Sequence, residues 1–212
     1  MANYLTIASP SEAIFREKMS RFLAFAVPVS TVAEAREQIA FFANKYHDAR
    51  HVCWAYMLGS DRKDFLSSDN GEPSGTAGKP ILGQINSFGL TNLVVIVVRY
   101  FGGIKLGTSG LIAAYREAAR LALEDATKIK GRDMTTLSFT FPYLAMNDVM
   151  KLLKAPLSGS GNDTVKIINQ DFDNTCSITI SLPLDLLNDF SSRLASLPGV
   201  STDYENRLNQ NT

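Results

Sequence analysis

Apolar positions in the first fifty residues predict two strands followed by a helix. Residues 4–7 and 22–29 are short apolar stretches of the kind that favours strands. Apolar residues then recur at helical intervals, and Thr31 and Glu34 have the spacing of an N-terminal capping box. We therefore expect a helix from about Thr31 to Tyr46.

The next fifty residues predict a strand, a long loop, a short helix and a second strand. Residues 51–58 are apolar and rich in strand formers, and a polar loop dense in glycine spans residues 59–78. Pro80 suits the first turn of a short helix to about Ser87, because its missing N–H costs nothing there. Residues 93–98 (LVVIVV) are continuously apolar and mostly β-branched, which predicts a strand buried on both faces.

A glycine-rich turn, residues 102–110, precedes an amphipathic helix. The apolar face of this helix is marked by Leu111, Tyr115, Ala118 and Ala122, and charged residues of both signs occupy the opposite face. The pattern predicts a helix that packs on the sheet with one face and meets solvent with the other.

The polar stretch 127–133 is the best candidate for a domain boundary. Beyond it, apolar patterns follow in the order strand, helix, strand, strand, helix, strand. This βαββαβ succession is the ferredoxin-like arrangement, in which two helices cover one face of an antiparallel sheet. The pattern thus predicts an α+β protein of two domains, residues 1–133 and 134–212.

Composition narrows the class of protein. Hydrophobic residues make up 45% and charged residues 20% of the 212 residues, which argues against a collagen, a disordered chain or a disulfide scaffold. Cys53 and Cys176 lie far apart in apolar segments, so we expect two reduced core thiols. The sequence lacks the pattern of a secretory signal and any apolar run of about 18 residues, so we expect a cytoplasmic protein without membrane contact.

The distribution of charge favours a polyanion site in the first half of the chain. The 21 basic and 21 acidic side chains cancel, so the whole molecule has no long-range attraction for nucleic acid. Residues 1–133 carry 16 basic and 13 acidic side chains, an excess of +3. There, Arg21-Phe22 and Arg99-Tyr100-Phe101 place basic beside aromatic side chains, which can neutralise phosphates and stack on bases or can pack in the core.

The glycine-rich loop after residues 93–98 is the strongest candidate for a phosphate site. Glycines let backbone N–H groups approach an anion, and the N-terminus of the following helix adds partial positive charge. The candidate binding residues are Arg99, Gly102, Gly103, Lys105, Gly107 and Thr108. Gly102 and Gly107 have the spacing of a Walker A motif, but Thr108 replaces its lysine, which disfavours ATP hydrolysis. A purely structural turn would use the same glycines.

The preceding loop offers a second set of polar residues. Its candidates are Asp69, Glu72, Ser74 and Thr76. Paired carboxylates can carry acid–base catalysis or hold a metal, and helix capping is the alternative. His51 and Cys53 share a strand face and, with His47, could form a metal site or a Cys–His pair. No metal-binding motif surrounds them, so we assign no catalytic residue, no metal ligand and no cofactor.

Two long motifs of the first half form a recognisable pattern. The first is residues 69–80 (DNGEPSGTAGKP), and the second is residues 99–107 (RYFGGIKLG), followed by Gly110 and Leu111. Together they resemble the IMPACT family, specifically its bacterial YigZ-type members. The resemblance covers about residues 20–126, and the region from Met134 onward is similar only in position, size and order of elements.

This resemblance implies both a fold and a role. It implies an N-terminal domain like the second domain of ribosomal protein S five and the fourth domain of elongation factor G, and a C-terminal domain like the fifth domain of that factor. It also implies association with RNA, the ribosome or translation factors. Ser109 stands where the family usually has glycine, and Ala113 stands where arginine is common, so one cation of the family pattern is missing.

The leading hypothesis is a non-catalytic protein that binds RNA or a ribosome-associated partner through the glycine-rich loop and regulates translation. Two alternatives stay open. One is a hydrolase or transferase that uses residues 69–76 with His51, and the other is a protein–protein adaptor. The sequence indicates no oligomeric state.

Overall fold

The computed structural model describes residues 3–155, 165–172 and 175–202. They divide into two units, Asn3–Gly131 and the described residues from Arg132 onward. No helix in these ranges is long and apolar enough to cross a membrane. Helices and strands occur in both units, so the chain is an α+β protein.

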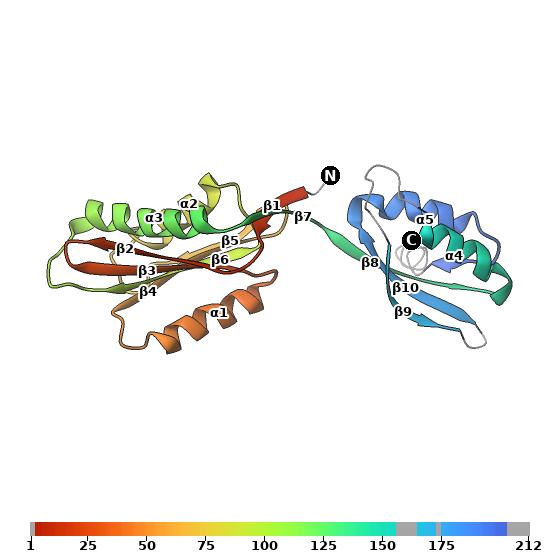
Figure 1. Cartoon of the computed structure of the whole chain (residues 1–212), viewed down its shortest axis with the longest axis horizontal. Coiled ribbons are helices and arrows are strands. Elements are labelled where there is room, and N and C mark those ends of the chain that lie inside the picture. Colours follow the sequence, from red (N-terminus) through yellow and green to blue (C-terminus); the bar gives the residue numbers. More distant parts are fainter. Residues whose placement is uncertain (1–2, 156–164, 173–174, 203–212) are drawn as a thin grey trace. The chain divides into compact units, whose positions relative to one another are not determined.

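The N-terminal unit is built on a five-stranded antiparallel sheet in the order β2-β3-β6-β4-β5 (Figure 1). Its strands are β2 (Ser11–Glu17), β3 (Ser20–Pro28), β4 (His51–Leu58), β5 (Asp64–Ser68) and β6 (Leu93–Tyr100). The central strand β6 pairs with β3 on one side and with β4 on the other, and His51 at the start of β4 lies opposite Arg99 near the end of β6.

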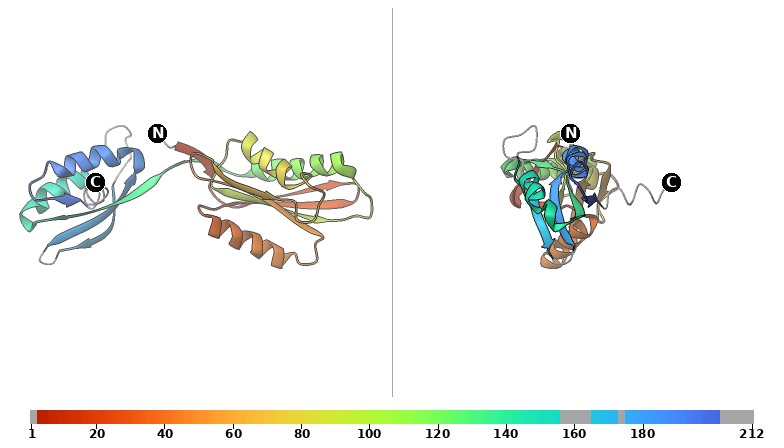
Figure 2. Two further views of the ribbon diagram at one scale, coloured as in Figure 1. Left: turned by 180° about the vertical axis from the view of Figure 1, so that it is seen from behind. Right: turned by 90° about the vertical axis from the view of Figure 1, so that its right-hand side faces the viewer.

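Helices cover both faces of this sheet. Helix α1 (Val32–Lys45) packs on one face, and α2 (Gly78–Ser87) and α3 (Gly107–Asp125) pack on the other (Figures 1 and 2). Along β6, Val94 and Ile96 face the core under α1, whereas Val95 and Val97 face the core under α2 and α3. The prediction of a strand buried on both faces is confirmed.

The predicted helix after Thr31 is also confirmed. The Oγ1 of Thr31 accepts a hydrogen bond from Glu34 N at 3.1 Å, and Glu34 Oε2 accepts one from Ser30 N at 2.7 Å. Glu34 therefore accepts from the N–H of Ser30, the residue before the N-cap, whereas in a standard capping box it accepts from the N–H of the N-cap residue itself.

Three strands were not predicted from the pattern. Strands β2 and β5 lie at the two edges of the sheet, where partly exposed positions blur the apolar alternation. The third is β7 (Lys128–Arg132), which pairs with β1 (Asn3–Ile7) in a two-stranded sheet. The polar stretch 127–133 therefore contains a strand.

The C-terminal unit has a four-stranded antiparallel sheet in the order β11-β8-β10-β9. Its strands are β8 (Met134–Phe141), β9 (Lys166–Asp171), β10 (Cys176–Pro183) and β11 (Ser201–Thr202). Helices α4 (Met146–Lys154) and α5 (Leu187–Ala195) follow the short 3₁₀ turns η1 (Tyr143–Ala145) and η2 (Leu184–Leu186) and share one face of the sheet (Figure 1). The order βαββαβ agrees with the prediction, although residues 203 and 204 of the last expected strand lie outside the described residues.

Candidate functional site

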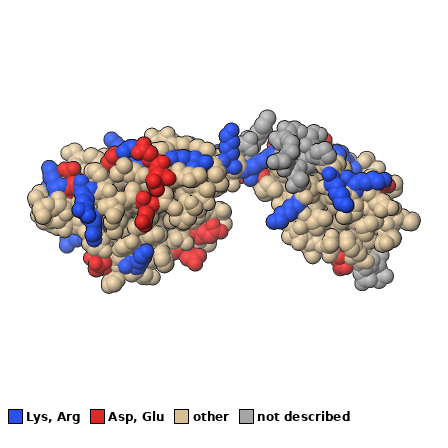
Figure 3. All heavy atoms as spheres, viewed as in Figure 1, with Lys and Arg blue, Asp and Glu red and all other residues tan. Residues whose placement is uncertain are grey.

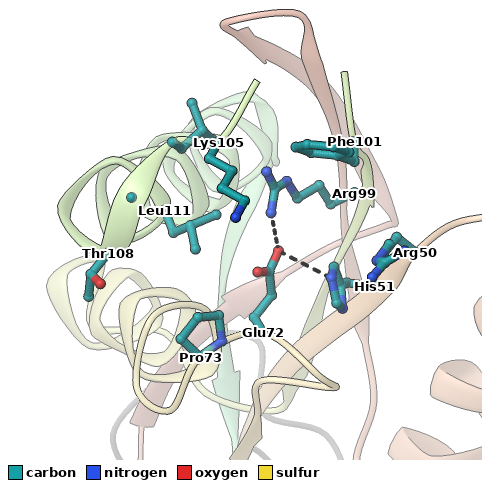
Figure 4. Close-up of a pocket in the computed structure, with 11 residues that line it drawn as sticks. Arg50, His51, Glu72, Pro73, Arg99, Phe101, Lys105, Thr108 and Leu111 are labelled. Atoms are coloured by element: carbon teal, nitrogen blue, oxygen red, sulfur yellow. Dashed lines mark hydrogen bonds and ion pairs between the residues drawn. The ribbon is translucent and has the colours of Figure 1, made fainter. Parts of the chain in front are cut away.

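The two loops that the sequence singles out meet at one end of the N-terminal unit. They enclose, with the start of β4 and the end of β6, a cavity of about 400 Å³ (Figure 4). The residues that line it are Arg50, His51, Glu72, Pro73, Arg99, Phe101, Lys105, Leu106, Gly107, Thr108 and Leu111.

A buried ion pair forms the floor of this cavity. Arg99 is 5% exposed and donates from Nη1 to Oε1 of Glu72 at 2.6 Å, and the hydroxyl of Tyr115 donates to the same oxygen at 2.8 Å. The guanidinium also lies 5.5 Å from the ring centroids of Phe22 and Phe101. Because desolvating two charges is costly, such a pair depends on compensating hydrogen bonds. Oε1 of Glu72 has two such bonds, whereas Nε of Arg99 has no partner among the described residues.

Cys53 lies behind this floor and is not a reactive thiol. Its Sγ is 2.9 Å from the carbonyl oxygen of Asp69 and 3.4 Å from the hydroxyl of Tyr115. Burial raises the pKa of Cys53 to about 12 and also raises the pKa of Tyr115 above its ordinary value. Both groups therefore stay protonated at neutral pH, the opposite of what a nucleophilic thiolate requires.

His51 borders the cavity, whereas His47 does not. The Nδ1 of His51 lies 2.9 Å from the carbonyl oxygen of Asn70, so this nitrogen carries the proton and donates it. The Nε2 atom then faces Oε1 of Glu72 at 3.9 Å. Among the described residues, no group of three or more His, Cys, Asp or Glu side chains is placed to hold a metal ion.

Asp69 shapes the first loop instead of lining the cavity. Its Oδ1 accepts hydrogen bonds from the N–H groups of Ala77 and Gly78 at 2.9 and 2.8 Å, and its Oδ2 accepts one from Gly75 at 2.7 Å. Burial disfavours the charge, but the three N–H donors outweigh it and lower the pKa of Asp69 below its usual range. The carboxylate thus stabilises the start of α2.

Of the other candidates in that loop, Glu72 alone lines the cavity. Thr76 donates from its hydroxyl to the carbonyl oxygen of Pro73 at 2.6 Å and so closes a turn, and Ser74 is exposed. The paired carboxylates considered from the sequence therefore have separate tasks, Asp69 in the loop and Glu72 at the floor.

The glycine-rich loop contributes four of its six candidates to the cavity, namely Arg99, Lys105, Gly107 and Thr108. Gly102 and Gly103 lie outside the lining. A Cβ atom at Gly102 would overlap the backbone carbonyl group of Met19, so glycine is needed there for the close approach of the turn between β2 and β3. Gly107 has a φ of +73° at the start of α3, a conformation that side chains disfavour.

Positive charge is concentrated at the rim of the cavity. The first turn of α3 has no side-chain cap and no acidic residue. Arg50 and Lys105 are exposed at the rim, and neither forms an ion pair with any carboxylate in the described part of the chain. Figure 3 shows basic side chains at this end of the unit, where β6 ends, with acidic side chains among them.

The sequence pattern does not single out Arg50, whereas it offers Phe101, within Arg99-Tyr100-Phe101, as a ring that can stack on bases or pack in the core. Arg50 comes directly before the first residue of β4, and Phe101 comes directly after the last residue of β6. The antiparallel register that sets His51 opposite Arg99 brings them to one cavity. For Arg50, the only signal in the sequence is that a basic residue stands directly before a predicted strand.

Comparisons with known proteins agree with the resemblance found in the motifs. The model of the Impact N-terminal domain matches residues 18–123. The IMPACT family member YigZ of Escherichia coli K12 is 33% identical over 197 residues, which are 92% of this chain and 93% of that protein. The IMPACT family member in pol 5′region of Thermus thermophilus is 41% identical over 136 residues, 64% of this chain and 73% of that one.

A solved structure extends the similarity to the fold. The crystal structure of an hypothetical protein superimposes with a TM-score of 0.72 at 32% identity, and the match covers 95% of this chain and 97% of that one. The motifs, the family model and relatives matched over most of their length agree, and the chain belongs to the IMPACT family.

Proposed function

We propose that this protein binds RNA, without catalysis, at the cavity between the two loops. The observation that carries the proposal is the pair of exposed cations, Arg50 and Lys105, which line the same cavity as the uncapped N-terminus of α3. Cations and backbone N–H groups are the usual partners of phosphate, and they give affinity with little base specificity.

The charge balance of the cavity supports an anionic ligand. Glu72 is matched by Arg99 at the floor, so the charges of Arg50 and Lys105 remain as a net positive excess. The N-terminus of α3, whose residues 107 and 108 line the same cavity, adds partial positive charge. A phosphate held at the rim meets this excess without displacing the buried pair.

An exposed aromatic ring favours a single strand over a duplex. Phe101 lines the cavity and is 46% exposed, so one side of its ring is open to a ligand. Bases of single-stranded nucleic acid stack on such rings, whereas bases in a duplex are already stacked on their neighbours. The ligand that suits the cavity is therefore an unpaired segment of RNA.

We also propose which known domains the two units are like and where in the cell the protein acts. We propose that the N-terminal unit is like the second domain of ribosomal protein S five and the fourth domain of elongation factor G. We propose that the C-terminal unit, with its sheet order β11-β8-β10-β9, is a ferredoxin-like domain like the fifth domain of that factor. The partners would be the ribosome or translation factors in the cytoplasm, and the role would be regulation of translation.

Fluorescence anisotropy of a labelled single-stranded oligouridylate, titrated at two salt concentrations, tests the proposal. We expect binding that weakens with salt, as phosphate contacts require. Lys105→Glu should weaken binding about tenfold and reduce the salt dependence by about one ion. Arg36→Glu makes the same change of charge at an exposed position of α1, away from the cavity, and should leave the affinity unchanged.

Three outcomes would contradict the proposal. Failure of the wild-type protein to bind at low salt would reject RNA as the ligand and favour the adaptor alternative. Unchanged affinity of a folded Lys105→Glu variant would reject this cavity as the site. Shortening of the labelled RNA on a denaturing gel would favour the hydrolase alternative.

A further inference from the structure

Glu72 presents two different carboxylate oxygens. Its Oε1 accepts from Arg99 at 2.6 Å and from Tyr115 at 2.8 Å, and it also faces His51. Its Oε2 accepts no hydrogen bond from any residue that the structure describes. Figure 4 shows this second oxygen turned away from Arg99 and His51, on the side of the cavity where Lys105 and Leu111 lie.

Oε2 of Glu72 is available to accept a hydrogen bond from a ligand in the cavity. The side chain of Glu72 is 4% exposed, and it lines the cavity. Oε2 is not one of the buried polar side-chain atoms that lack a partner in the described part of the chain, so it meets the solvent of the cavity. A ligand that displaces this solvent has to replace its hydrogen bond, and a hydrogen bond to an ionised acceptor is stronger than one between neutral groups. The ligand therefore gains affinity if it places an O–H or N–H group against Oε2.

The placement of charges restricts what kind of group this can be. A phosphate would be repelled by Glu72 and attracted by Arg50 and Lys105, so the anionic part of a ligand belongs at the rim. In a ligand whose only charges are phosphates, the part that reaches the floor is then a neutral hydrogen-bond donor. In RNA, the 2′-hydroxyl of each ribose meets this requirement, and DNA has no equivalent group.

We propose that Oε2 of Glu72 accepts a hydrogen bond from a ribose 2′-hydroxyl and thereby makes the cavity selective for RNA over DNA. This inference rests on the proposed RNA binding and assigns Glu72 as its specificity-determining residue. Arg99 and Tyr115 hold the carboxylate in position through Oε1, so both of its oxygens have a defined task.

The test compares three labelled single strands of one sequence with the wild-type protein: oligouridylate, its 2′-deoxy form and its 2′-O-methyl form. Neither modified strand can donate a hydrogen bond from the 2′ position. We expect the unmodified strand to bind about tenfold more tightly than either modified strand, the change that one such hydrogen bond produces.

A matched pair of variants assigns the effect to Glu72. Glu72→Gln keeps the shape of the side chain but allows the amide N–H₂ group to replace the free acceptor. Loss of the negative charge acts on both strands alike, so we expect the affinities of this variant for oligouridylate and for the deoxy strand to become equal within about twofold. Glu12→Gln removes the same charge at an exposed position of β2 outside the cavity and should keep the full preference.

The outcomes separate this inference from the function on which it rests. Equal affinity of the wild-type protein for all three strands, with the effect of Lys105→Glu retained, overturns the role of Glu72 and leaves RNA binding standing. A folded Glu72→Gln variant that keeps the preference also overturns it. Absence of binding to every strand removes both proposals. If circular dichroism shows that Glu72→Gln does not fold, the comparison of strands on the wild-type protein decides.

Discussion

Single side chains hold the candidate site together over long distances in sequence. Glu72 and Arg99 are 27 positions apart, and Tyr115 lies further along the chain. Arg99 and Tyr115 nevertheless donate hydrogen bonds to the same carboxylate oxygen of Glu72. The sequence identified Arg99 and Glu72 as candidates in separate loops. Their pairing could not be predicted, because it depends on how the loop between β5 and α2 packs against the end of β6 and not on any spacing along the chain.

Asp69 gives the clearest prediction at the scale of one residue. Asp69→Asn replaces a charged acceptor of three N–H groups by a neutral side chain, so we expect the free energy of unfolding at neutral pH to fall by about 1–3 kcal/mol. Chemical denaturation followed by circular dichroism measures the difference. Asp64→Asn, at an exposed position of β5, is the control.

The loss of stability caused by Asp69→Asn should depend on pH. The pKa of Asp69 is lower in the folded than in the unfolded protein, so its stabilising effect is present above the unfolded pKa, about 3.9. The effect is lost as the pH falls through the folded pKa. The stability difference between wild type and Asp69→Asn should therefore shrink below about pH 4. A difference that stays constant into acid would contradict this explanation.

At the scale of elements, the sequence predicts best where local signals and burial agree. The helix after Thr31 has a cap, an apolar face and a clear end, and β6 has an unbroken apolar run. The edge strands β2 and β5 and the polar strand β7 have neither signal, because they are stabilised by pairing with neighbours that lie elsewhere in the sequence. Those pairings appear only once the sheet is assembled.

The cap of α1 is a test of this local reasoning. Thr31→Ala removes the oxygen that accepts from Glu34 N, so we expect a loss of about 1 kcal/mol in the free energy of unfolding. Thr31→Ser keeps the acceptor and should lie close to wild type. Urea denaturation midpoints measure both, and equal midpoints for the alanine and serine variants would show that the cap contributes nothing.

At the scale of the molecule, the N-terminal unit contains its own core. Its two hydrophobic clusters, on either side of the sheet, draw all their buried residues from the range 7–126. We therefore propose that residues 1–133 form an independent domain and expect this fragment to fold alone. Trp54 is the only tryptophan of the chain and lies in this unit, so its fluorescence follows unfolding of the fragment. A gradual transition without a cooperative midpoint would show that the fragment needs the rest of the chain.

The central position of β6 has a consequence for how the cavity can change. Amide hydrogens of a strand that is paired on both sides and covered on both faces exchange with solvent only when the whole unit opens. Arg99 belongs to this strand, whereas Lys105 belongs to an exposed loop. The strand that contributes Arg99 to the floor therefore has the full stability of the fold, and the loop that contributes Lys105 to the rim can change its shape or its sequence at little cost in stability.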